Sequence, residues 1–162
     1  MSPILGEEAR RLLDGWRAAG ARIVFTNGVF DLLHRGHVEY LAQARALGDR
    51  LIVGVNSDDS VRRLGKGRER PLVAAADRAA VLGALRSVDL VVVFEDDTPE
   101  RLIHAVRPDV LAKGGDWAKE AIVGREFVES TGGRVVSVPL RQGFSTRALV
   151  ERIRLESRRP PP

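Results

Sequence analysis

Short runs of β-branched and aliphatic residues alternate along the chain with longer amphipathic stretches, and this alternation constrains the fold most. The runs show no polar–apolar alternation, which is typical of strands covered on both faces in a parallel sheet. We therefore predict an α/β fold, a Rossmann-like doubly wound parallel sheet of about five strands in three α/β/α layers. Strands are expected at residues 22–26, 50–56, 90–94, 110–113 and 134–139, and helices at 6–19, 36–47, 75–85, 99–106, 119–130 and 146–155.

The composition indicates one domain over residues 1–162, with a core at about 22–154 and a basic tail ending in prolines at 155–162. The absence of cysteine excludes disulfides and thiolate metal sites and fits a reducing compartment. No apolar run approaches the roughly 18 residues of a membrane span. A cytoplasmic protein without a membrane partner is expected. The net charge of +4 lies largely in the tail, and aromatic residues make up only 5% of the chain, so no nucleic-acid partner is expected.

The segment TNGVFDLLHRGH follows the first predicted strand and leads into a helix. Ligands of such sheets bind beyond the carboxyl ends of the strands, and a helix N-terminus favours phosphate. His34 and His37 are three residues apart and share one helical face, and Gly36 between them permits close approach of a ligand. A histidine pair of this spacing also occurs in metal sites and in helix caps. Phosphate binding is favoured because no acidic third ligand shares that face.

The same segment resembles the H-x-G-H signature of the cytidylyltransferase-like nucleotidyltransferases. The resemblance implies that His34 and His37 stabilise transition-state charge. It places Thr26 and Asn27 against phosphate, and assigns Gly28, Phe30 and Gly36 to nucleotide binding as well. Asp31 is expected either to order the turn or to orient a metal-bound water.

Three further segments match the same family. KGRERPL is similar to its K-G-x-x-R-P segment, which implies that Lys66 contacts the α- and β-phosphates with Arg70 nearby, although the segment alone fits a solvated loop. KGGDW is similar to a nucleotide-site turn, and GFSTR to a phosphate-facing helix start in which Arg147 replaces a second threonine. The residues so implied for the nucleotide are Lys113, Gly115, Asp116, Ser145 and Thr146.

Asn56 and Asp58, at the exit of the second strand, are expected either to contact the acceptor or to cap the turn. Over about residues 22–154 the chain resembles the adenylyltransferases of ADP-heptose synthesis. This implies the conversion of ATP and D-glycero-β-D-manno-heptose 1-phosphate to ADP-heptose and pyrophosphate, for lipopolysaccharide or another surface heptose, with Mg²⁺ carried by the ATP phosphates. A homodimer is implied, as are a separate kinase and phosphatase, since no kinase domain fits in 162 residues. The alternatives are a cytidylyltransferase acting on glycerol 3-phosphate or another phospho-alcohol, and a non-catalytic nucleotide-binding module.

Overall fold

The strands of the computed structural model form one parallel sheet, in the order β3-β2-β1-β4-β5. The structure describes residues 4–65, 67, 69–115 and 121–157. The strands are β1 Ile23–Gly28, β2 Arg50–Asn56, β3 Leu90–Phe94, β4 Val110–Gly114 and β5 Arg134–Val138. The predicted parallel α/β sheet is therefore confirmed.

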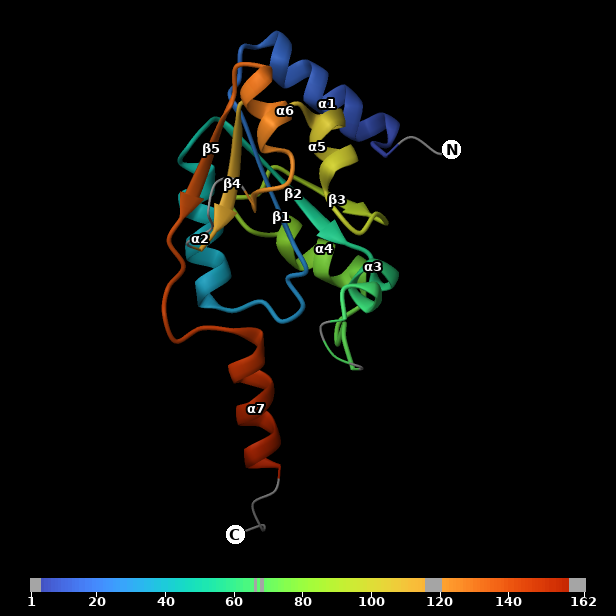
Figure 1. Cartoon of the computed structure of the whole chain (residues 1–162), viewed down its shortest axis with the longest axis vertical. Coiled ribbons are helices and arrows are strands. Elements are labelled where there is room, and N and C mark those ends of the chain that lie inside the picture. Colours follow the sequence, from blue (N-terminus) through green and yellow to red (C-terminus); the bar gives the residue numbers. More distant parts are fainter. Residues whose placement is uncertain (1–3, 66, 68, 116–120, 158–162) are drawn as a thin grey trace.

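Helices cover both faces of this sheet (Figure 1). One buried cluster joins α1, α5 and α6 to one face, and a second joins α2 and α4 to the other. The predicted three layers are thereby confirmed. The helices are α1 Glu7–Ala18, α2 Arg35–Arg45, α3 Asp58–Arg63, α4 Ala75–Gly83, α5 Glu100–Val106, α6 Arg125–Ser130 and α7 Thr146–Glu156.

Three elements differ most from the sequence prediction. The helix predicted at 119–130 is α6 and begins only at Arg125, because the residue before it, Gly124, has a left-handed φ of 85°. β1 runs two residues further, because its pairing with β2 continues through Gly28 and Val55. The helix α3 occupies the start of what the sequence indicated as a loop. Ser57 caps α3, since its Oγ accepts a hydrogen bond from the Ser60 amide at 3.1 Å.

The central strand β1 separates two halves of the chain. β2 and β3 lie on one side of it, and β4 and β5 on the other. Loops leaving the carboxyl ends of β1 and β4 therefore diverge, which creates the crevice where open α/β sheets bind ligands. The side chains of Asn27 and Lys113 meet across this crevice at 2.7 Å between Oδ1 and Nζ.

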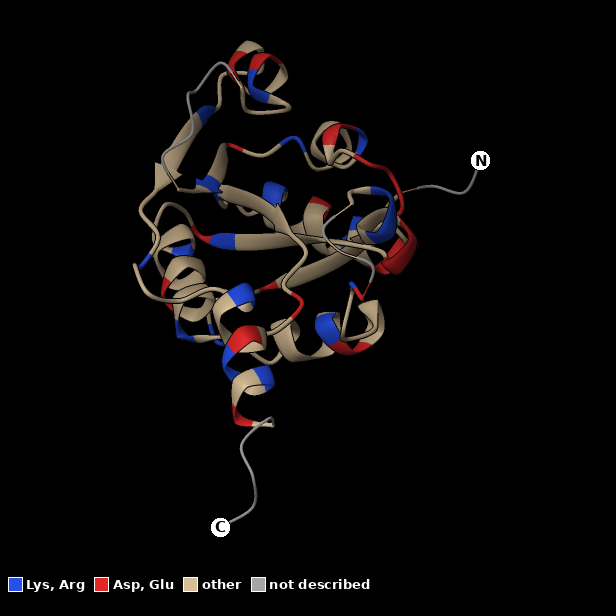
Figure 2. Cartoon of the chain, turned by 60° about the horizontal axis from the view of Figure 1, so that its bottom comes forward, with Lys and Arg blue, Asp and Glu red and all other residues tan. Residues whose placement is uncertain are grey.

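The helix α7 extends away from the sheet (Figure 1), and none of its residues is buried. It carries side chains of both charges along its length (Figure 2). Contacts through Thr146, at its first turn, and Arg154 join it to the rest of the chain. Among the described residues, no helix has both the length and the apolar character needed to cross a membrane.

Candidate active site

Two helices, α2 and α7, begin beside one small cavity of about 210 Å³. The unpaired amides and the positive dipole end of each helix favour an anion there. The structure thus brings together residues that are more than a hundred positions apart in the sequence. The cavity is lined by His34, Gly36, His37, Leu140, Arg141, Phe144, Ser145 and Thr146.

His34 is the N-cap of α2, and its Nδ1 accepts a hydrogen bond from the His37 amide at 3.4 Å. A neutral imidazole that accepts at Nδ1 carries its proton at Nε2. His34 therefore serves as a cap at one nitrogen and offers a donor at the other. The two imidazole rings stack, with centroids 3.8 Å apart and planes inclined by 18°. The cap and ligand roles weighed for this pair are thus compatible.

Burial lowers the pKa of His37 to about 4, and the neighbouring charge of His34 contributes in the same direction. Burial also lowers the pKa of His34 below its ordinary value. The Nδ1 of His37 is buried and has no hydrogen-bond partner among the described residues. Both rings are therefore neutral near pH 7 without an anion. A nearby phosphate raises the proton affinity of each, because negative charge favours the protonated form.

Glycines at two positions allow the histidine rings to pack. A Cβ on Gly36 would lie 3.0 Å from His34 Nδ1 and 3.0 Å from Phe144 Cβ, and one on Gly28 would lie 3.0 Å from the Phe30 ring. Phe30 has a φ of 50°, and its ring meets His37 edge-on at 5.2 Å. Gly28, Phe30 and Gly36 therefore shape the surroundings of the imidazole pair.

Of the residues expected at the first turn, Thr26 lies away from the cavity. Its side chain is fully buried, and its Oγ1 lies 2.6 Å from the hydroxyl of Tyr40. That hydroxyl also donates to the Ala112 carbonyl at 3.3 Å. The structure thus places the Thr26 side chain in the packing of α2 against β1 and β4, outside the lining of this cavity. The expected contact of Thr26 with phosphate stays a prediction. Asn27 is more accessible and bridges to Lys113 as described.

Asp31 is almost fully buried, and both of its carboxylate oxygens have protein partners. Oδ1 accepts from the Leu72 and Val73 amides at 2.8 and 2.9 Å, and Oδ2 pairs with Arg70 Nη1 at 2.6 Å. Of the two roles expected for Asp31, this geometry supports ordering the turn. It also ties the end of the basic segment to the turn that carries the histidines. Lys66, in the same segment, lies outside the described residues.

Asn56 and Asp58, both considered for the acceptor, make internal contacts. The Asn56 amide donates to Ser60 Oγ at 3.0 Å, and Asp58 Oδ1 accepts from the Ala75 amide at 2.9 Å and from Arg78 at 2.8 Å. The capping alternative therefore fits Asp58. Sequence analysis missed Arg78, a buried arginine that also donates to the Val73 and Val29 carbonyls. One feature of the sequence could have indicated it: Arg78 is the one basic residue in the helix AADRAAVLG, which otherwise consists mostly of small and apolar residues.

The nucleotide-site residues further along the chain lie at the ends of β4 and α7. Gly115 adopts a φ of 100° and donates its amide to the Val138 carbonyl at 2.9 Å. Ser145 caps α7, accepting from the Ala148 amide at 3.1 Å, and Thr146 Oγ1 lies 3.5 Å from the Leu32 carbonyl. Asp116 lies outside the described residues.

Comparisons with known proteins identify the family of this chain. The cytidylyltransferase-like family model matches residues 25–155. The chain is 57% identical over 142 residues to the bifunctional protein HldE of Pelobacter propionicus, an alignment covering 88% of this chain and 29% of that protein. It is 54% identical over 147 residues to the HldE of Caulobacter vibrioides, covering 91% and 30% respectively. The chain thus spans less than a third of the length of these curated relatives.

Two solved structures resemble this chain. The lipopolysaccharide core biosynthesis protein from Thermoplasma volcanium is 28% identical, with a TM-score of 0.63 over 75% of this chain and 98% of that one. A pantothenate synthetase from Thermus thermophilus, at 19% identity and a TM-score of 0.56 over 85% of this chain and 65% of that one, shares the fold. Because the family model spans most of the sequence and includes the paired histidines at the start of α2, the chain belongs to the cytidylyltransferase-like family.

Proposed function

We propose that this chain transfers the adenylyl group of ATP to D-glycero-β-D-manno-heptose 1-phosphate, giving ADP-heptose and pyrophosphate. The observation that carries the proposal is the stacked imidazole pair at the start of α2, beside a cavity that the start of α7 also borders. The high identity to HldE proteins and the likeness to a lipopolysaccharide core biosynthesis protein support a sugar-phosphate acceptor over other acceptors.

In this reaction a phosphate oxygen of the acceptor attacks the α-phosphorus, and the bond from that phosphorus to the pyrophosphate oxygen breaks. The nucleophile is already anionic, so no general base is needed. Catalysis consists of positioning and of stabilising charge on the α-phosphate and the leaving pyrophosphate. His34 donates from Nε2, and His37, desolvated against Phe30, gains a donor proton as negative charge accumulates.

Mg²⁺ enters this proposal bound to the triphosphate. Within the described part of the chain, no three His, Asp or Glu side chains gather closely enough to hold a metal ion. Asp31, the one candidate for a metal-bound water, already has partners for both oxygens. The ion would neutralise phosphate charge, while the protein contributes helix N-termini and imidazoles.

The remaining assignments follow the positions of the side chains. Asn27 and Lys113, across the crevice between β1 and β4, are proposed to face the nucleotide together with the backbone at Gly115. Ser145 and Thr146 are proposed to direct the α7 amides at the phosphates. We also propose, from the family resemblance, that Lys66 contacts the α- and β-phosphates. A homodimer, and a separate kinase and phosphatase that supply the acceptor, also stay predictions.

The test is pyrophosphate release from ATP and from CTP, each offered with heptose 1-phosphate, other sugar 1-phosphates and glycerol 3-phosphate. We expect turnover with ATP and heptose 1-phosphate to exceed every other pair. A preference for CTP or for a phospho-alcohol would refute the proposed substrates, while the nucleotidyl-transfer reaction itself would stand. No release with any pair would favour a non-catalytic nucleotide-binding module.

A further inference from the structure

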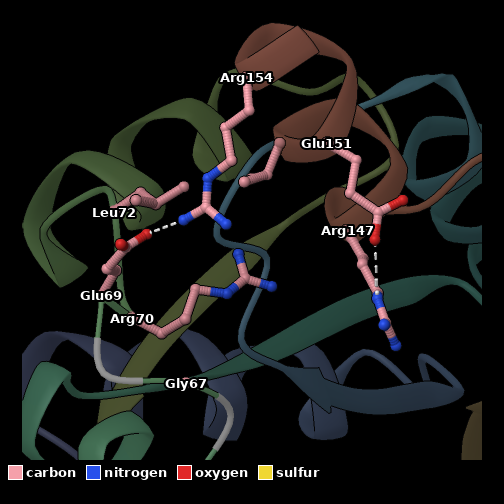
Figure 3. A pocket seen from close by; sticks show the side chains of 8 residues that line it. Gly67, Glu69, Arg70, Leu72, Arg147, Glu151 and Arg154 are labelled. Atoms are coloured by element: carbon pink, nitrogen blue, oxygen red, sulfur yellow. Dashed lines mark hydrogen bonds and ion pairs between the residues drawn. The ribbon is translucent and has the colours of Figure 1, made fainter.

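Another and larger cavity lies between α7 and the loop residues Gly67, Glu69, Arg70 and Leu72 (Figure 3). It measures about 530 Å³, which is within the usual range for small-molecule sites of roughly 300–1,000 Å³. We call it the arginine cavity. Its charged lining consists of Arg70, Arg147, Arg154, Glu69 and Glu151.

Three arginines from two separate elements line this cavity, Arg70 from the loop and Arg147 and Arg154 from α7. The side chains of Arg70 and Arg154 enter it from opposite walls, so that their cationic ends face each other (Figure 3). Each arginine pairs with a carboxylate at one side: Arg154 with Glu69, Arg147 with Glu151, and Arg70 with Asp31. Like charges that converge in this way favour an anion between them.

The carboxylates from the cavity wall are weakly held partners. The side chains of Glu69 and Glu151 are 68% and 60% exposed, and exposed ion pairs contribute little stability because solvent screens them. A phosphate dianion accepts several charge-assisted hydrogen bonds from guanidinium groups, often two from one arginine. Phosphate can therefore replace these carboxylates at small cost.

Both walls of the arginine cavity are attached to the two residues Asp31 and Leu32, which lie just before His34 in the chain. The loop wall is attached through the Arg70–Asp31 pair at 2.6 Å. The helix wall is attached through Thr146, whose Oγ1 lies 3.5 Å from the Leu32 carbonyl. The arginine cavity therefore lies beside the turn that presents the histidines, which the proposed function places at the α-phosphate.

We propose that the arginine cavity binds the phosphate group of the acceptor, a sugar 1-phosphate, through Arg147 and Arg154, with Arg70 at its inner side. This inference rests on the proposed function and adds the acceptor site to it. The residues expected for that role, Asn56 and Asp58, are engaged in internal contacts. Leu72 and Val150 provide an apolar wall for the C–H face of a sugar ring.

The kinetic test compares Arg154→Gln and Arg147→Gln with Arg152→Gln, which removes the same charge from α7 outside the cavity lining. Because α7 buries no residue, all three variants are expected to fold. We expect KM for heptose 1-phosphate to rise roughly tenfold in the two cavity variants, with KM for ATP changed less than about twofold. Glu69→Gln removes the competing carboxylate and is expected to lower the acceptor KM. A raised KM for ATP alone, or equal effects in all three arginine variants, would overturn the proposal.

A binding measurement separates this inference from the proposed function. Inorganic phosphate is titrated calorimetrically into the full chain without nucleotide, for the wild type, Arg154→Gln and Arg152→Gln. Loss of phosphate binding in Arg154→Gln alone supports the cavity, even if heptose 1-phosphate proves not to be the acceptor. Equal binding by all three proteins, or none by the wild type, refutes it. Absence of turnover in the wild type would count against the proposed function only.

Discussion

The imidazole rings of His34 and His37 stack with their centroids 3.8 Å apart, while the backbone amide of His37 donates to the ring of His34. The stack couples the two titrations, because a proton on one ring disfavours a proton on the other. A phosphate in the adjoining cavity would oppose this effect, since negative charge raises the proton affinity of both rings. We therefore expect the pair to gain positive charge as negative charge accumulates on the leaving pyrophosphate.

Replacement of His37 by alanine is expected to lower kcat by roughly 10²-fold or more, the size of one electrostatic contact made in the transition state. KM for ATP should change much less, because a neutral imidazole contributes little to ground-state binding. Steady-state pyrophosphate release measures both constants. The matched control is His104→Ala, which removes an imidazole that stacks on Phe127 away from this cavity. Unchanged turnover in His37→Ala would refute the catalytic role.

The depressed pKa of His37 predicts a pH dependence of stability. The unfolded chain protonates this ring near its ordinary pKa of 6.5, and the folded chain only near 4. Between these values the unfolded state binds more protons, so the free energy of unfolding falls as the pH falls from 6.5 toward 4. One such group contributes a slope of at most about 1.4 kcal/mol per pH unit.

Urea unfolding of the wild type and of His37→Gln between pH 4 and 7 measures this slope. In the variant, the slope of the free energy of unfolding against pH should lack the contribution of the His37 proton. The contribution of His34, whose pKa is also lowered, should remain. Addition of a nonhydrolysable ATP analogue should raise the pKa of His37 in an NMR titration. Identical slopes in the two proteins would show that the ring is already hydrated when the site is empty.

Much of the fold follows from local sequence, but contacts between distant segments do not. The β-branched runs place β2 and β3 at their observed bounds, and the histidine spacing places the start of α2. Contacts between distant side chains carry no local signal. Asp31 meets Leu72 and Val73 some forty residues away, which follows from the strand order and the path of the loop rather than from either segment.

The same limit applies to two residues that the sequence suggests for the site. Thr26 follows the pattern of a strand exit, yet β1 continues past it, and its side chain is fully buried against the hydroxyl of Tyr40. The local sequence suggests that Asp58 is an exposed turn residue, but in the fold Arg78 of α4 donates a hydrogen bond to its carboxylate. Motif spacing predicts which elements meet at the site, and tertiary packing decides which side chains remain available there.

The hydrogen bond between Tyr40 and Thr26 is expected to hold α2, the helix of the paired histidines, against the sheet. Burial raises the pKa of Tyr40 to about 12, so the hydroxyl keeps its proton over the working pH range. Tyr40→Phe leaves Thr26 Oγ1 without this partner and should destabilise the fold by about 1–3 kcal/mol. Tyr40→Phe combined with Thr26→Val should cost less than the sum of the single changes. Strict additivity in chemical denaturation would show that the two hydroxyls do not interact.

Arg78 joins three segments of the chain, and its loss is the most severe change expected among residues that line neither the cavity beside the paired histidines nor the arginine cavity. Its guanidinium is nearly fully buried and donates to the Val29 carbonyl after β1, to the Val73 carbonyl before α4, and to Asp58 on α3. Arg78→Met keeps a similar side-chain volume but leaves the Asp58 carboxylate and the two carbonyls without the hydrogen bonds of the guanidinium.

Breaking a buried ion pair from one side typically costs about 3–5 kcal/mol, and the partial exposure of Asp58 places Arg78→Met near 3 kcal/mol. Arg86→Met, an exposed change just beyond α4, should stay within about 0.5 kcal/mol of the wild type. If the penalty comes from the stranded carboxylate, Asp58→Asn should recover part of it in the Arg78→Met background. A similar loss with and without Asp58→Asn would assign the penalty to the two carbonyls instead. A loss no larger than that of Arg86→Met would show that water replaces the guanidinium and that the three segments hold together without it.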